Sequence, residues 1–190
     1  LFGAAAPGPG VFMAAPKSQV ARKEEVESMQ HGFLPNVRNL PVSFYVGLED
    51  KNTMPGTYLY AWDRLLELRA EDPGGYAAIE FRSFEGLAHE FPPGEPARSL
   101  EWLATHVRDP WPTKLVWEYA SDPFPQAADD DPLRRLPKTQ FYWLWCGKPQ
   151  DAMRVGATRE GNEFDVTIEK ADPRDFSLLL RKELIDEERD

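Results

Sequence analysis

The chain has 190 residues, of which 42% are hydrophobic and 28% are charged, and its formal net charge is −10. This composition is ordinary for a globular protein that buries one core or two small ones, so it excludes disorder of the whole chain. Lysine and arginine are scattered and outnumbered by acidic residues, which excludes a basic surface for nucleic acid. The sequence also lacks the roughly 18 consecutive apolar residues of a membrane span.

The first half of the chain alternates apolar runs with helical patterns, which is typical of a parallel sheet covered by helices. The expected elements are an exposed helix over 19–30, a buried strand over 41–47, a helix over 57–70, a strand over 76–84, and a helix that begins near Pro96. The helix over 57–70 has its apolar residues at helical spacing, at Tyr58, Leu59, Trp62, Leu65 and Leu66. The last helix carries Leu100, Leu103 and Val107 on one face. We therefore expect an α/β domain over residues 1–108.

After residue 108 the pattern changes to strands alone. The prolines of Asp109-Pro110-Trp111-Pro112 indicate a linker over 109–113. Short alternating runs predict strands over 114–120, 139–146, 153–159, 163–169 and 176–181, with a turn at Glu160-Gly161-Asn162. These strands predict a small antiparallel β-sandwich over 114–190, and the segment 123–136 is expected to be a loop.

The expected strand over 139–146 is unusually aromatic. Alternation places Phe141, Trp143 and Trp145 on one face and leaves Tyr142, Leu144 and Cys146 on the other. Because both faces are apolar, we expect the strand to be buried on both sides. The alternative is that one aromatic face stacks against a ligand. Cys146, the single cysteine, is expected to be a buried apolar residue.

Two residues follow the expected strands of the first half in a pattern that suggests catalysis. Asp50 stands in Gly47-Leu48-Glu49-Asp50 and His89 in Gly86-Leu87-Ala88-His89, each just past a strand. Parallel strands joined by one helix usually lie side by side, so the loops at their carboxyl ends are neighbours. A carboxylate there can orient an imidazole and stabilise its charged form. Glu49 is the alternative acid, and without this context either residue would be an ordinary turn or surface residue.

These residues resemble the last third of the α/β-hydrolases. Strand-Gly-x-x-Asp, a helix, strand-Gly-x-x-His and a closing helix occur in that order, in particular in esterases of the polyhydroxybutyrate-depolymerase and predicted-peptidase branch. The opening Phe2-Gly3-Ala4-Ala5-Ala6-Pro7-Gly8 and the run His89-Glu90-Phe91-Pro92-Pro93-Gly94-Glu95 are similar to that branch as well. The resemblance covers roughly residues 1–107. It implies the C-terminal half of an α/β-hydrolase parallel sheet and a serine hydrolase with Asp50 as the acid and His89 as the base.

The nucleophile that this resemblance implies has no counterpart in the chain. In the family it stands in Gly-x-Ser-x-Gly and precedes the acid and the base. The serines before Asp50 are Ser18, Ser28 and Ser43, and none has that surrounding. We therefore expect the chain to be a piece of a longer protein, with the serine and the first oxyanion-hole donor upstream of Leu1.

The resemblance also implies a substrate and a location. The substrate is expected to be a small or polymeric carboxylic ester, or less favourably a peptide, and the chemistry needs neither a metal ion nor an organic cofactor. Export from a bacterial cell is suggested for the location. The alternative hypothesis is a non-catalytic protein, in which a hydrolase-like half and a β-sandwich bind a polymer or a partner.

The missing nucleophile makes a first prediction about the chain as given. The purified 190-residue chain should show no hydrolysis of p-nitrophenyl acetate that depends on an activated serine, because the acid and the base of the expected triad have no serine nucleophile beside them. Turnover that a serine-reactive inhibitor abolishes would contradict this and would require a nucleophile inside the chain.

Overall fold

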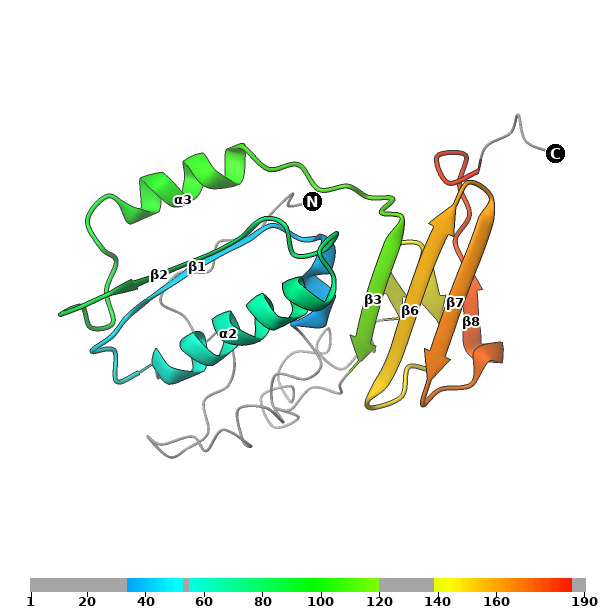
Figure 1. Ribbon diagram of the computed structural model, residues 1–190, viewed down its shortest axis with the longest axis horizontal. Helices are drawn as coiled ribbons and strands as arrows, with labels where there is room; N and C mark the ends of the chain where they lie inside the picture. The colour runs from blue at the N-terminus through cyan, green and yellow to red at the C-terminus, as the bar shows by residue number, and fades with distance from the viewer. Residues whose placement is uncertain (1–33, 53–54, 120–138, 186–190) are drawn as a thin grey trace, which may run out of the picture. The chain divides into compact units, whose positions relative to one another are not determined.

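The computed structural model describes residues 34–52, 55–119 and 139–185. The chain divides into two compact units, Leu1–Asp109 and Pro110–Asp190 (Figure 1). The expected helix over 19–30, the expected loop over 123–136 and the opening segment 2–8 lie outside the described residues. None of the helices in the described ranges combines the length and the apolar character needed to cross a membrane.

The first unit contains a two-stranded parallel sheet. The strands β1 (Val42–Gly47) and β2 (Ile79–Phe84) pair in parallel, from Val42 beside Ile79 to Gly47 beside Phe84. The helix α2 (Pro55–Glu71) connects them, and a 3-10 helix, η1 (Pro35–Asn39), precedes β1. The predicted parallel and adjacent arrangement of the two strands is confirmed. Unit 1 is thus of mixed helix and strand content, and its parallel sheet has two strands in the described part of the chain.

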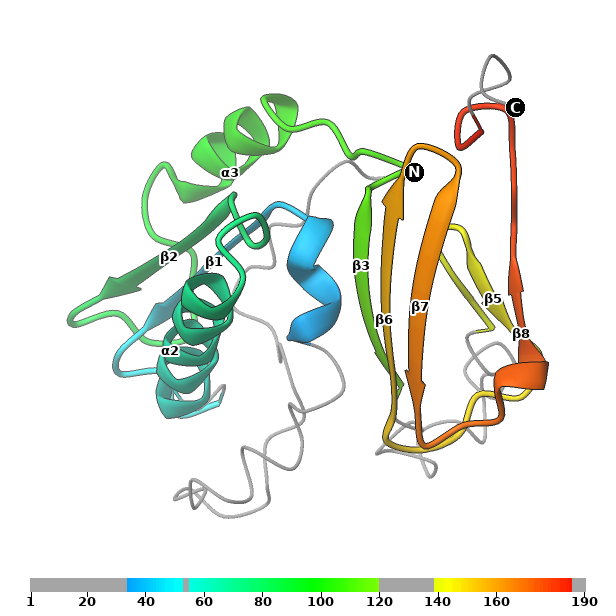
Figure 2. The same ribbon diagram turned by 45° about the vertical axis from the view of Figure 1, so that its right-hand side comes forward.

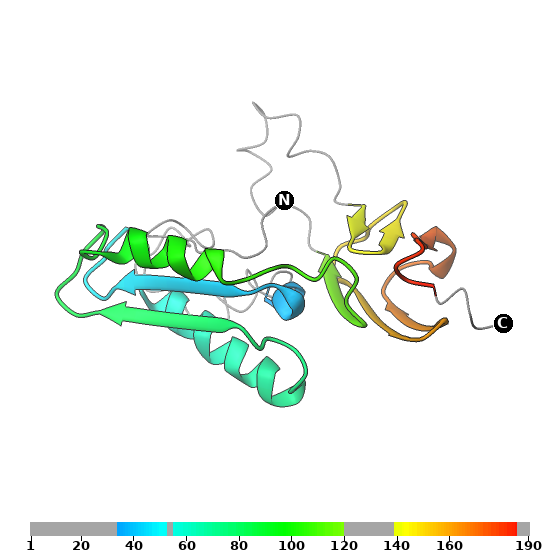
Figure 3. The ribbon, with the colours of Figure 1, turned by 90° about the horizontal axis from the view of Figure 1, so that it is seen from above.

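One face of this sheet is apolar and packs against α2 (Figure 3). The Phe44 ring lies in the middle of the contact, with its centroid 4.9 Å from that of Phe81 and 6.3 Å from that of Tyr58. The buried members of the core are Leu34, Val42, Phe44, Val46, Tyr58, Ala61, Leu65, Leu68, Tyr76 and Ile79. Most of them come from alternate residues of β1 and from one face of α2, as the two periodicities require, and Leu34, Tyr76 and Ile79 add to the core from outside these two elements.

Two of the leucines expected on the packed face of α2 lie elsewhere. Leu59 and Leu66 are 42% and 40% exposed, whereas Tyr58 and Leu65 are 2% and 0% exposed. Each exposed leucine directly follows a buried residue, and one residue turns the side chain by about 100° around a helix. The helix is therefore predicted correctly, but its buried stripe is narrower than its apolar residues suggest.

The helix α3 (Glu95–Ala104) lies on the opposite face of the sheet from α2 (Figures 1 and 3). Its predicted apolar face is buried only in part, because Leu103 is half-buried while Leu100 is 68% exposed and Val107, which lies beyond the helix, is 90% exposed. Glu95 is the buried residue of this helix. The physical reason is that the sheet beneath α3 presents polar side chains, so a charged residue docks there more favourably than a leucine.

The second unit contains two three-stranded antiparallel sheets. One is formed by β3 (Lys114–Tyr119), β6 (Met153–Glu160) and β7 (Glu163–Glu169). The other is formed by β4 (Gln140–Phe141), β5 (Leu144–Cys146) and β8 (Phe176–Leu178), which follows the 3-10 helix η4 (Pro173–Asp175). Figure 2 shows β5 and β8 to the right of the sheet of β3, β6 and β7. The predicted turn is confirmed, since Glu160 pairs with Glu163 and Gly161 has a φ of 58°.

The predicted single strand over 139–146 is wrong. The chain reverses after Phe141, which pairs with Leu144 across Tyr142 and Trp143, and Tyr142 has a left-handed φ of 53°. The reversal breaks the expected row of three rings. Trp143 is completely buried and donates its indole N–H to the Pro112 carbonyl (2.9 Å), while Trp145 is 38% exposed.

A single apolar cluster fills the space that the two sheets of the second unit share. The indole ring of Trp143 meets Phe164 edge-on, with the centroids 5.5 Å apart, and Trp117 stacks on Phe141 at 5.7 Å. Cys146 is fully buried, as expected, and burial raises the pKa of its thiol above the usual value.

The contrast between neighbouring leucines in α2 gives a stability prediction. Leu65→Ala should lower the free energy of unfolding by about 2–5 kcal/mol, because it leaves a cavity in a fully buried site. Leu66→Ala, one residue further along the same helix, should lower it by less than about 1 kcal/mol. Urea denaturation of both variants measures the difference, and equal losses would contradict the assigned core of α2.

Candidate functional site

Asp50 lies at the carboxyl end of β1, in a turn that its own side chain helps to form. Its backbone N–H donates to the Gly47 carbonyl (3.1 Å), and its Oδ1 accepts from the backbone N–H of Asn52 (2.8 Å). The residue is 1% exposed. A buried carboxylate fixed by a backbone N–H on one oxygen can present its other oxygen in a defined direction.

Gly47 allows the loop after β2 to lie directly against the end of β1. A Cβ atom on Gly47 would stand 2.3 Å from the Leu87 carbonyl oxygen and 2.5 Å from that of Ala88. Two hydrogen bonds join the same loops, from Leu48 N to Phe84 O and from Glu49 N to Leu87 O, both 2.9 Å long. The glycine therefore sets the separation of the loops that carry Asp50 and His89.

His89 projects from this second loop onto Asp50. Its Nδ1 lies 2.9 Å from Asp50 Oδ2, and its side chain is 43% exposed while that of Asp50 is 0% exposed. The expected proximity of the two residues is confirmed. Glu49, the alternative acid, has an exposed side chain, and the carboxylate that meets the imidazole is that of Asp50.

This arrangement suits proton transfer at the other ring nitrogen. An ionised carboxylate only accepts hydrogen bonds, so Nδ1 of His89 carries the proton when it faces Asp50. The neutral imidazole then has a free lone pair on Nε2, where it can accept a proton from a reacting group. The buried carboxylate stabilises the imidazolium that forms.

A nucleophile for this pair is not among the described residues that precede Asp50. Ser43 lies inside β1, is 1% exposed, and has its Oγ 3.4 Å from Nη2 of Arg82. Ser18 and Ser28 lie outside the described residues. Across residues 34–52, 55–119 and 139–185, no group of three or more His, Cys, Asp and Glu side chains is placed to hold a metal ion.

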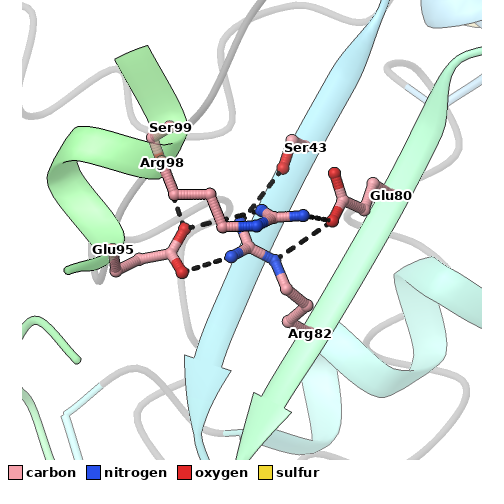
Figure 4. A network of polar contacts seen from close by, with 6 residues as sticks. All are labelled: Ser43, Glu80, Arg82, Glu95, Arg98 and Ser99. Atoms are coloured by element: carbon pink, nitrogen blue, oxygen red, sulfur yellow. Dashed lines mark hydrogen bonds and ion pairs between the residues drawn. The ribbon is translucent and has the colours of Figure 1, made fainter. Parts of the chain in front are cut away.

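A network of charged side chains joins the polar face of the sheet to α3 (Figure 4). Arg82 of β2 donates through Nη1 to Oε2 of Glu95, and its Nε lies 3.3 Å from Oε1 of Glu80. Arg98 of α3 donates to the same oxygen of Glu80. Ser99 donates to Oε1 of Glu95 (3.0 Å). The side chain of Glu95 is 3% exposed, whereas that of Arg98 is 44% exposed. The buried centre of the network is therefore the pair of Arg82 and Glu95.

Tyr45 lies on the same face of the sheet as this network. Burial raises the pKa of its phenol to about 12, and the negative charge of Glu95 adds to the increase. Its hydroxyl is buried and has no hydrogen-bond partner in the described part of the chain. The phenol is thus protonated and uncharged at physiological pH.

Sequence reasoning found Asp50 and His89 but missed the groups around them. The contact of Gly47 depends on the path of another loop, which local sequence does not reveal. The network offered one signal, because Glu80 and Arg82 occupy alternate positions of a strand and so share a face. Their partner Glu95 belongs to another element and could not be assigned from spacing.

Comparisons of the chain with protein-family models, with curated proteins and with solved structures gave no match.

The close approach at Gly47 makes a prediction about the site. Gly47→Ala should separate the two loops, lower the free energy of unfolding by roughly 1–3 kcal/mol, and weaken the Asp50–His89 hydrogen bond. Thermal denaturation and the downfield Nδ1 proton resonance of His89 measure both effects. Gly56→Ala in α2 is the control, because a Cβ there meets nothing within 4 Å and alanine favours helix. A Gly47→Ala protein that keeps the resonance and the stability would contradict the argument.

Proposed function

We propose that the protein is a serine hydrolase that acts on carboxylic esters, with His89 as the general base and Asp50 as the acid that orients it. The observation that carries this proposal is the 2.9 Å contact between Nδ1 of His89 and the fully buried carboxylate of Asp50. The pair stands at the carboxyl ends of two adjacent parallel strands, where open α/β sheets place their sites.

The two residues would divide the proton transfers of an acyl transfer reaction. Nε2 of His89 would accept the proton of the attacking serine and later return it to the leaving group. Asp50 would keep the proton of the neutral ring on Nδ1 and stabilise the imidazolium. A half-exposed imidazole on a buried carboxylate supports this division, because the ring is accessible to substrate while its partner is not exposed to water.

The nucleophile and the oxyanion hole would come from sequence that precedes Leu1. The resemblance of Gly47-Leu48-Glu49-Asp50 and Gly86-Leu87-Ala88-His89 to α/β-hydrolases supports this, since their serine comes before the acid and the base in the chain. In this proposal β1 and β2 are the last part of a larger parallel sheet. The second unit would be a β-sandwich-like accessory region.

In the full-length protein, substitutions of His89 and of Asp50 should both lower kcat/KM strongly. His89→Ala should lower kcat/KM for p-nitrophenyl acetate on the order of 10⁴-fold or more, because it removes the proposed general base of the serine. Asp50→Asn should also lower it strongly, on the order of 10⁴-fold, because an amide favours the wrong tautomer of His89. Steady-state kinetics on folded variants gives the values.

Glu49→Gln is the matched control for Asp50→Asn. It removes the neighbouring carboxylate, which is exposed, and leaves the backbone hydrogen bond from Glu49 N to Leu87 O in place. We expect its kcat/KM to be unchanged. A reversed ranking of these two variants would move the acid to Glu49. Full activity in His89→Ala would leave the non-catalytic binding protein as the remaining function.

A further inference from the structure

The loop that carries His89 is attached to the sheet mainly at its ends. At the first end, the hydrogen bonds from Leu48 N to Phe84 O and from Glu49 N to Leu87 O fix it against β1. Between Ala88 and Phe91 the described structure has one backbone hydrogen bond, from Glu90 N to Ala88 O, and it lies within the loop. Phe91 approaches Tyr45 (6.4 Å between centroids) but is 61% exposed. The position of His89 therefore depends on where the second end of the loop is held.

The second end is Glu95, the first residue of α3. Its backbone N–H donates to the Pro92 carbonyl (3.0 Å), so the last turn of the loop moves with the start of the helix. Its carboxylate is buried and is bound by Arg82 and Ser99. Pro92 of the loop is buried as well, whereas Leu100 of the helix is 68% exposed, so Glu95 is the buried charged residue that attaches this end.

Arg82 is well placed to anchor this end rigidly. It projects from β2, next to Tyr45 of β1 in the strand register, and its guanidinium also lies near Glu80 and Ser43 (Figure 4). A guanidinium with several partners in fixed directions has little rotational freedom. Its side chain is 19% exposed, so water competes weakly for the ion pair with Glu95.

We propose that the Arg82–Glu95 ion pair is a clamp that positions His89 against Asp50. Neither residue has a contact with His89 in the described structure, so both act as positioning residues through the loop. The consequence for catalysis depends on the proposed function, whereas the effect on the Asp50–His89 hydrogen bond does not. Without the ion pair the loop would be attached firmly at one end alone, and the imidazole would leave Asp50 for part of the time.

The test compares Glu95→Gln with Glu80→Gln in the full-length protein. Each variant removes one negative charge from the same network, but Glu80 pairs with the half-exposed Arg98 further along α3 and not with the residue at the end of the loop. Long-range ¹H–¹⁵N spectra of the histidine side chains report which ring nitrogen of His89 carries the proton. We expect the proton on Nδ1 in the wild type and in Glu80→Gln, and a mixture of both tautomers in Glu95→Gln.

Kinetics provides the second measurement. A base displaced by about 1 Å costs on the order of 10²-fold in rate, so kcat of Glu95→Gln should fall by about that factor while KM changes little. Arg82→Lys keeps a positive charge opposite Glu95 and should retain more of the Nδ1 tautomer than Arg82→Gln. This pair of variants also keeps the test decisive if Glu95→Gln does not fold.

The outcomes separate the clamp from the proposed function. An unchanged His89 tautomer in folded Glu95→Gln, or equal changes in Glu95→Gln and Glu80→Gln, would overturn the clamp, because the network would then act only on general stability. The same holds if Arg82→Lys and Arg82→Gln have identical spectra. A tautomer shift confined to Glu95→Gln, in a full-length protein that neither hydrolyses esters nor reacts with a fluorophosphonate, would support the clamp and overturn the hydrolase.

Discussion

The parallel pairing of β1 with β2 is the constraint on which the candidate site depends. Residue-for-residue pairing from Val42 to Gly47 brings both carboxyl ends to the same edge of the sheet. The loops that follow must then share one small space, and Gly47 lets their backbones come within the distance at which a Cβ would collide. Asp50 and His89, far apart in the sequence, meet because of this approach and not because of any local preference of their own segments.

Different interactions hold the helices α2 and α3 on the two faces of the sheet of β1 and β2. Aromatic and aliphatic side chains pack α2 onto one face, and the free energy of such a contact hardly depends on direction. An ion pair and its hydrogen bonds hold α3 on the other face, and these interactions do depend on direction. The helix α3 directly follows the loop of His89. It is thus held by directional interactions, which fix its position more closely than apolar packing would.

The second unit is stabilised by apolar packing between its two sheets. The strands β4, β5 and β8 have only two or three residues each, and their sheet shares one apolar cluster with the sheet of β3, β6 and β7. The turn at Tyr142 directs Trp143 into that cluster, where the Pro112 carbonyl accepts its indole N–H. A buried tryptophan needs such a partner, because an unpaired N–H in an apolar core is costly. Trp145 remains as a partly exposed ring, separate from the others.

The sequence by itself determined most of the helices and strands of the described residues, because periodicity and turn residues are local properties. It also determined the pairing of Asp50 with His89, since one connecting helix between two parallel strands leaves few arrangements. The tertiary structure decided what depends on neighbours. An apolar residue is buried only where another element covers it, so Leu100 and Val107 are exposed despite their spacing. A continuous apolar run also cannot reveal a reversal such as that at Tyr142. The partner of a charged strand residue, such as Glu95 for Arg82, is chosen by the fold, because it comes from a separate element.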